Sequence, residues 1–199
     1  MNDSKEDFMN TKKNTMSTET LVLGAALTAL VIVLQFLGAF IRLGPFQISL
    51  VLIPIVIGAA KCGTLIGGWL GFVFGLVVLL NGDASVFLAI NAPGTILTVL
   101  LKGTACGVAA GLVYRALENV NRMLAVAAAA IVCPIVNTGI FLLGCLLFFM
   151  DTIASWAGSD GVGHYIIFGL VGGNFLVELG SNLLLSPIVV KILDLRKKH

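Results

Sequence analysis

Long apolar segments separated by short polar connections dominate this sequence. A helix needs about 20 mostly apolar residues to cross the roughly 30 Å hydrocarbon core of a bilayer. The candidate spans are residues 20–41, 47–61, 63–80, 93–114, 122–150 and 163–193. The second is short and contains Pro54, whereas the last two are long enough to tilt or bend. The pattern predicts an all-α, integral membrane six-helix bundle.

Basic residues distribute unevenly along the connections between these segments. Lys and Arg are enriched at the cytoplasmic ends of membrane helices. If the N-terminus is inside, the outer side receives only Arg42, and Lys102 lies within the fourth span. The cytoplasmic side then receives Lys5, Lys12, Lys13, Lys61, Arg115, Arg122, Lys191, Arg196, Lys197 and Lys198. This asymmetry predicts a multi-pass protein of a bacterial-type cell membrane with both termini cytoplasmic.

The first residues differ in composition from the rest of the chain. Residues 1–19 are polar and of mixed charge, which is typical of a disordered segment. We therefore expect a cytoplasmic tail over residues 1–19 and a single six-span membrane domain over residues 20–199.

Composition and motif content argue against several classes of function. The chain is 58% hydrophobic and only 11% charged, whereas a soluble domain carries about 25% charged residues. A net charge of +2 gives no basis for nucleic-acid binding. The four cysteines form no CxxC pair and only two histidines are present, so we expect neither a metal site nor a disulfide. No hydrolase, metalloprotease or Walker motif occurs, so we expect no enzyme activity, no bound cofactor, and ATP use only by partner subunits.

The two longer outer connections indicate where a ligand is captured. Residues 81–92 and 151–163 mix polar and apolar side chains, whereas the inner connections are short and basic. Loops on a rigid scaffold commonly carry binding residues. Asn81 and Asn91, at the borders of the first of these loops, are therefore candidate ligand contacts, and Arg42 and Gln47 are candidates at the outer mouth.

Polar residues inside the spans are costly in hydrocarbon and usually face an interior or a cavity. Asn174, Glu178 and Asn182 are spaced i, i+4, i+8 and share one helix face. Lys102 lies roughly 12 Å from the outer end of its span at 1.5 Å per residue. Asn137 follows Pro134 in the fifth span. These five polar residues complete the candidate substrate site.

Lys102 and Glu178 are the ionisable residues deep in the membrane, and their charges are opposite. The two can pair, directly or through asparagine neighbours. Glu178 can instead be protonated and simply hydrogen-bonded. In a third interpretation, Lys102, Glu178 or the asparagines contact a polar ligand in a cavity open to the outside. The first and third interpretations are compatible.

Small residues recur at helical spacing in the first and third spans. Ala25 and Ala29 share one face of the first span, and Gly63, Gly67, Gly71 and Gly75 form a four-residue repeat in the third. Such patterns allow close helix–helix approach. They serve either packing within this protein or docking of a separate membrane partner.

The stretch GPFQISLVLIPIVIGAAKCG, residues 44–63, and the glycine-rich span after it resemble the substrate-binding S component of energy-coupling factor (ECF) vitamin transporters. Length, span number, topology, the Ala25/Ala29 pattern and the polar closing helix NFLVELGSN are similar too. The resemblance implies capture of a vitamin from outside and association with one transmembrane scaffold subunit and two ATPase subunits. It also implies that Ala25 and Ala29 contact the scaffold.

One stretch of sequence and the polar candidate residues bear on which vitamin would be bound. QISLVLIPIVIGA looks most like the pantothenate group and its unassigned neighbours. An anionic, hydroxylated, amide-bearing ligand suits Lys102 or Arg42 together with asparagines. Folate, niacin or a queuosine precursor would use the same residue types. The alternative function is an accessory or structural membrane subunit with no small-molecule ligand, in which Lys102 and Glu178 only neutralise each other.

Overall fold

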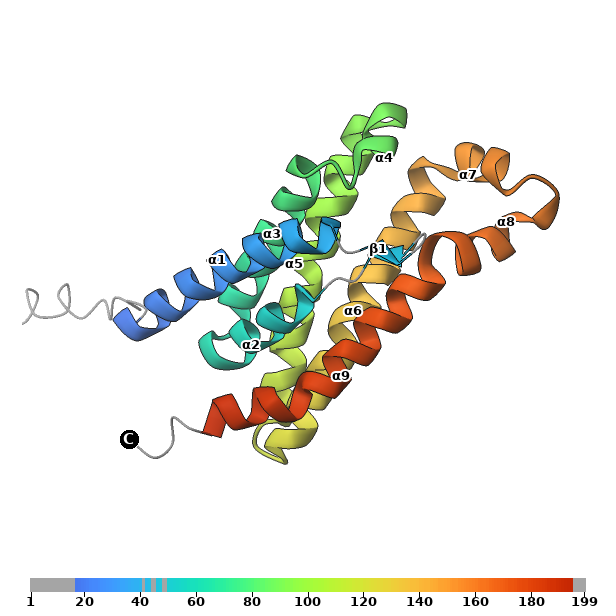
Figure 1. Cartoon of the computed structure of the whole chain (residues 1–199). Coiled ribbons are helices and arrows are strands. Elements are labelled where there is room, and N and C mark those ends of the chain that lie inside the picture. The colour runs from blue at the N-terminus through green and yellow to red at the C-terminus, as the bar shows by residue number, and fades with distance from the viewer. Residues whose placement is uncertain (1–16, 41, 44–45, 48–49, 195–199) are drawn as a thin grey trace, which may run out of the picture.

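Helices form at each of the six apolar segments. The computed structural model describes residues 17–40, 42–43, 46–47 and 50–194. The main helices are α1 (Thr18–Phe40), α2 (Leu52–Cys62), α3 (Thr64–Leu80), α5 (Ala92–Leu117), α6 (Arg122–Phe148) and α9 (Gly172–Asp194). They pack into one bundle (Figure 1). The predicted all-α membrane bundle is thus confirmed.

Local sequence explains where the central helices begin. The side chain of Asn91 accepts a hydrogen bond from the Gly94 backbone N–H at 2.9 Å and caps α5. The side chain of Asn121 accepts from Leu124 N–H at 3.1 Å and caps α6 in the same way. Each cap satisfies a backbone donor that the first helical turn leaves without a partner.

Short elements fill several connections between the main helices. A two-stranded hairpin, β1 (Arg42–Leu43) and β2 (Phe46–Gln47), follows α1, and α4 (Ser85–Ile90) lies between α3 and α5. The remaining short elements are α7 (Met150–Ala157), η1 (Gly158–Asp160), α8 (Val162–His164) and η2 (Tyr165–Val171), which is a π-helix leading into α9. The segments expected as outer loops, residues 81–92 and 151–163, are therefore largely helical.

The structure corrects the predicted second and third spans. Span two was expected to begin at residue 47, but Gln47 pairs with Arg42 in the hairpin and α2 begins at Leu52. With 11 residues, α2 covers only about 17 Å. Gly63 has φ +93°, a conformation that favours glycine, and forms the turn between α2 and α3 instead of belonging to span three. Apolar composition did not reveal either break.

Four helical stretches are long and apolar enough to cross a membrane: Thr18–Gly38, Ala92–Leu117, Arg122–Phe148 and Val162–Lys191. Two shorter apolar helices, α2 and α3, accompany them. Helix α1 begins at Thr18, two residues before the predicted domain boundary. The rest of the predicted disordered tail, residues 1–16, lies outside the described residues.

The two ends of the bundle differ in charge and in structure. The start of α1, the end of α9 and the turns α2–α3 and α5–α6 lie toward one end, and α4, α7 and α8 lie toward the other (Figure 1). Lys61, Arg115, Arg122 and Lys191 belong to the first end. By the positive-inside rule that end is cytoplasmic, and the short helices face outward.

Glycines allow α3 and α5 to pack backbone to backbone. A Cβ atom at Gly67 would lie 2.7 Å from the Gly107 carbonyl oxygen, and one at Gly75 would lie 2.9 Å from the Val99 carbonyl oxygen. A Cβ atom at Gly71 would overlap the Gly103 carbonyl. The glycine repeat therefore serves packing within this protein, one of the two interpretations left open by the sequence, with Gly67, Gly71 and Gly75 as its members.

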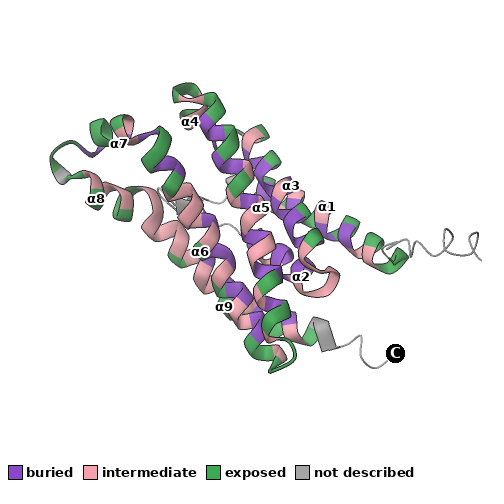
Figure 2. Cartoon of the chain, turned by 180° about the vertical axis from the view of Figure 1, so that it is seen from behind, coloured by how far each residue is buried: buried purple, intermediate pink, exposed green. Residues whose placement is uncertain are grey.

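Burial is concentrated in the centre of the bundle. Buried residues follow α2, α3 and α5, while the outward faces of α1 and α9 are exposed (Figure 2). On α9 the buried residues are Glu178, Asn182, Ser186 and Val189, which lie along a single stripe. The polar face predicted for the last span is therefore the face turned toward the bundle.

Candidate functional site

A cavity of about 280 Å³ lies in the outer half of the bundle. Helices α1, α3, α5, α6 and α9 and the π-helix η2 provide its walls, together with the α3–α4 connection, α4 and Phe149. Its polar lining residues are Gln35, Asp83, Thr95, Thr98, Lys102, Asn137, Thr138, Asn174 and Glu178. Its apolar lining residues are Phe74, Val78, Ala84, Phe87, Val99, Phe141, Phe149, Leu170, Val171 and Phe175. Ligand sites commonly combine an apolar wall with a few convergent polar groups, as here.

Lys102 projects from α5 into this cavity between two aromatic rings. Its Nζ lies 5.7 Å from the ring centre of Phe74 and 5.3 Å from that of Phe141. Both distances are within the range of a cation–π interaction. The described residues give this ammonium two phenyl rings but no hydrogen-bond acceptor. The cation is therefore held in position while its donors remain available to the cavity.

Glu178 faces the same cavity from α9 and is buried. The Asn137 side chain on α6 lies within hydrogen-bonding reach of its carboxylate. Lys102 and Glu178 attract each other electrostatically. Within the described residues, however, no nitrogen–oxygen distance of 4.0 Å or less joins them. The direct ion pair considered from sequence is thus absent from this part of the structure, and the two charges face a shared space.

Asp83 organises the outer mouth. Its Oδ2 accepts hydrogen bonds from Gln35 Nε2 at 2.8 Å and from Asn81 Nδ2 at 2.7 Å. The Asp83 backbone N–H donates to Asn81 Oδ1 at 3.0 Å. Gln35 belongs to α1, so this carboxylate ties the α3–α4 connection to the first helix.

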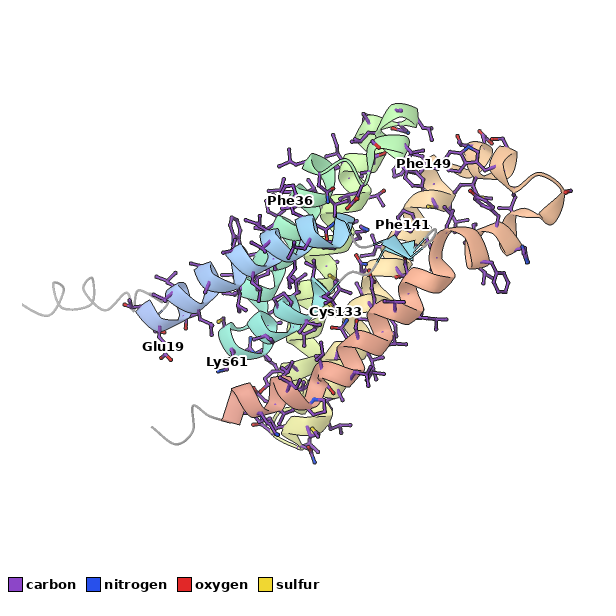
Figure 3. The ribbon with its side chains drawn as sticks, viewed as in Figure 1. Glu19, Phe36, Lys61, Cys133, Phe141 and Phe149 are labelled. Carbon is purple, nitrogen blue, oxygen red and sulfur yellow. The ribbon has the colours of Figure 1, made fainter. Side chains whose placement is uncertain are left out.

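Phe87 contacts two other phenylalanines that line the cavity. The Phe87 ring, on α4, meets Phe149 edge-on at a 5.0 Å centroid separation and Phe141 at 5.7 Å. Figure 3 shows Phe141 and Phe149 toward the outer end of the bundle and Lys61 at the opposite end. Edge-to-face ring pairs add to the stabilisation from area burial. These contacts attach α4 to α6 and to Phe149, which directly follows α6.

The structure divides the predicted site residues into distinct groups. Lys102, Asn137, Asn174 and Glu178 all line the cavity. Asn81, Asn91 and Asn182 are not among its lining residues. Asn81 orders the Asp83 turn and Asn91 caps α5, as described above. Asn182 lies one turn beyond Glu178, with its buried Nδ2 lacking a partner. The side chains of Arg42 and Gln47 lie outside the described residues, although their backbones pair in the hairpin.

Sequence reasoning missed Asp83, the lining threonines and the phenylalanine walls. The phenylalanines come from four different helices and the segment after α6, so no local spacing marks them as a group. Gln35 is a polar residue inside an apolar span, which was a usable signal. Its 6% exposure and its bond to Asp83 show that it faces inward.

The small-residue face of α1 has a different environment. Ala25 and Ala29 are exposed, so this pattern does not pack against another described helix of the chain. Val22, Val33 and Phe36, also on α1, are exposed apolar residues. Helix α1 thus turns Gln35 toward the cavity and an alanine-containing apolar surface outward.

No group of three or more His, Cys, Asp or Glu residues within the described parts of the chain is placed to hold a metal ion. Cys106, Cys133 and Cys145 are buried thiols, and Cys62 is partly buried. Their environment fits the packing role expected from sequence.

Comparison with protein families identifies the chain. The sequence model described as "ECF transporter, substrate-specific component" matches residues 19–190, which is nearly the whole membrane domain. Comparisons with curated proteins and with solved structures found no match. The resemblance noted from sequence is thereby confirmed, and this chain belongs to the family of ECF transporter substrate-specific components.

Proposed function

We propose that this substrate-specific subunit captures a small water-soluble vitamin at the outer face of the membrane and delivers it through a scaffold subunit and two ATPases. Membership of the family establishes the role of substrate-specific subunit in an ECF importer. The single observation that supports capture by this chain is the outer-half cavity, with Lys102, Asn137, Asn174 and Glu178 converging on it.

Pantothenate remains the best candidate vitamin. Its carboxylate suits the Lys102 ammonium, because charge-assisted hydrogen bonds are about twice as strong as neutral ones. Its hydroxyl and amide groups suit the asparagines and threonines of the wall. The cavity of about 280 Å³ is at the small end for ligand sites, which favours a compact vitamin. The phenylalanine walls also accommodate a small aromatic vitamin such as niacin.

The exposed alanine face of α1 supports the second half of the proposal. Small residues allow another helix backbone to approach closely in a membrane, where packing rather than the hydrophobic effect drives association. Ala25 and Ala29 are free of packing within the described chain, so this face is available to the scaffold subunit.

Equilibrium binding of labelled pantothenate and a vitamin panel to the detergent-purified protein tests the capture role. We expect one vitamin to bind, and Lys102→Ala and Asn174→Ala to weaken its binding by about tenfold or more, which corresponds to about 1.4 kcal/mol. Lys61→Ala is the matched control, because Lys61 lies in the last turn of α2 at the cytoplasmic end. Expression and thermal stability of all three variants are measured in parallel.

Normal binding by both cavity variants would show that the site lies elsewhere. Failure of every vitamin to bind would instead favour an accessory subunit without a ligand.

A further inference from the structure

We infer that the ligand is dipolar, with an anionic group that binds Lys102 and an N–H or O–H donor that binds Glu178. This inference rests on the proposed function and specifies the chemistry of the substrate. It assigns to Glu178 a role in ligand selection rather than in neutralising Lys102.

The Lys102 end of the cavity requires an acceptor. Lys102 is partly buried, and an ammonium that loses hydration needs hydrogen-bond acceptors or a counter-charge to offset that loss. Phe74 and Phe141 supply only their ring faces. The aromatic contacts fix the position of the cation, and the described residues leave the acceptor for the ligand to provide.

The Glu178 end requires a donor. Glu178 is 9% exposed and lines the cavity. Asn137 lies within reach of its carboxylate, yet a carboxylate accepts about four hydrogen bonds. Among the described residues, this one amide leaves acceptor positions open on the Glu178 carboxylate. A ligand that covers this carboxylate without donating to it forfeits those bonds and desolvates a charge.

A single ligand can contact both Lys102 and Glu178, because both side chains face one cavity. They project from different helices, α5 and α9, into one cavity, and they are more than 4.0 Å apart. A ligand that carries both an anionic group and a donor can place one against each charge, whereas a plain anion only adds negative charge to a cavity that Glu178 and Asp83 already line. Because the low dielectric of such a site strengthens charge interactions, this difference favours the dipolar ligand.

A matched series of benzene derivatives tests the inference on the full chain in detergent. The probes are benzoate, benzylamine and 4-(aminomethyl)benzoate, which carry the anion alone, the cation alone, and both. Their dissociation constants are measured by isothermal titration calorimetry. We expect 4-(aminomethyl)benzoate to bind about tenfold or more tightly than either singly charged probe.

Two nearly isosteric substitutions test which residue binds each charged group of the probe. Lys102→Met should abolish the advantage of 4-(aminomethyl)benzoate over benzylamine, and Glu178→Gln should abolish its advantage over benzoate. Lys61→Met is the control at the cytoplasmic end and should retain the wild-type order. The comparison of the three probes on the unmodified protein does not depend on the folding of any variant.

Benzoate binding as tightly as 4-(aminomethyl)benzoate, or no binding of the latter, would overturn the inference. An unchanged probe order in Glu178→Gln would overturn the role of Glu178. Neither result contradicts the proposed function, which fails separately if no vitamin binds in the panel experiment. The natural ligand gives a further check, since a captured vitamin without an anionic group or without a donor also refutes the dipolar class.

Discussion

At the residue scale, the polar residues singled out from the sequence fall into two groups: some face the cavity and others bond to nearby backbone. Lys102 and Glu178 face the cavity without pairing directly within the described structure. Asn81 and Asn91, which looked equivalent to them in sequence, bond to nearby backbone. Asparagine competes well for such local roles, so its presence alone did not identify a ligand contact.

The hydrogen bond from Gln35 to Asp83 should slow the dissociation of the ligand. Gln35→Leu removes the donor on α1 that holds the α3–α4 connection at the mouth. A hydrogen bond to a charged group contributes about 1.5–3 kcal/mol. We therefore expect faster ligand dissociation with a smaller change in association rate, measured by stopped-flow or filter-binding kinetics.

The matched control for this prediction is Thr20→Val, which alters another polar side chain of α1 at the cytoplasmic end. Equal dissociation rates in Gln35→Leu and the unmodified protein would show that the mouth does not depend on this bond.

At the element scale, glycines set the separation of α3 and α5. Gly67, Gly71 and Gly75 face carbonyl groups of α5, so the two helices pack more closely than side chains would permit. This contact places Phe74 on α3 opposite Lys102 on α5, at the 5.7 Å cation–π distance. The packing of the repeat and the geometry of the site are therefore connected.

A single methyl group tests this helix contact. Gly71→Ala places a Cβ atom onto the Gly103 carbonyl, and overpacking of this kind costs about 1–3 kcal/mol. We expect a lower melting temperature in detergent by scanning fluorimetry. Gly139→Ala in α6 is the control, because a Cβ atom there meets nothing within 4 Å.

Equal melting temperatures for the two glycine variants would contradict the close α3–α5 contact.

The sequence predicted which segments form helices better than it predicted where those helices begin and end. Apolar runs located all six main helices, since hydropathy determines which segments enter a bilayer. It did not reveal the hairpin at Arg42–Gln47 or the turn at Gly63, because neither interrupts the apolar composition strongly. Lys102 and Glu178 were identifiable because burying a charge is costly. The aromatic wall was not, because Phe74, Phe87 and Phe141 meet only through tertiary packing.

At the scale of the whole molecule, the proposed capture site and the proposed docking face lie on different parts of the bundle. The cavity is lined in part by α4, and α4, α7 and α8 lie toward one end of the bundle (Figure 1). Lys61 and Arg115, in the last turns of α2 and α5, belong to the other end. Helix α1 contributes to both, with buried Gln35 at the cavity and exposed Ala25 and Ala29 on its outward face. A change on that face should alter partner association without altering the ligand site.

Ala25→Trp tests this separation. The bulky ring prevents close approach of a second helix, so we expect loss of co-purification with the scaffold subunit while ligand affinity stays unchanged. Leu184→Trp is the control, because Leu184 is an exposed residue on α9.

Unchanged co-purification of Ala25→Trp, or equal loss in both tryptophan variants, would contradict docking through the alanine face.

Capture of a vitamin by this protein is tested most directly by mass spectrometry of the small molecules that heat releases from the purified protein. We expect a stoichiometric water-soluble vitamin from the unmodified protein and from Lys61→Ala, and much less from Lys102→Ala. A protein that releases nothing and binds no added vitamin would contradict capture in this cavity. Equal release from Lys102→Ala would contradict the role of Lys102 in holding the ligand.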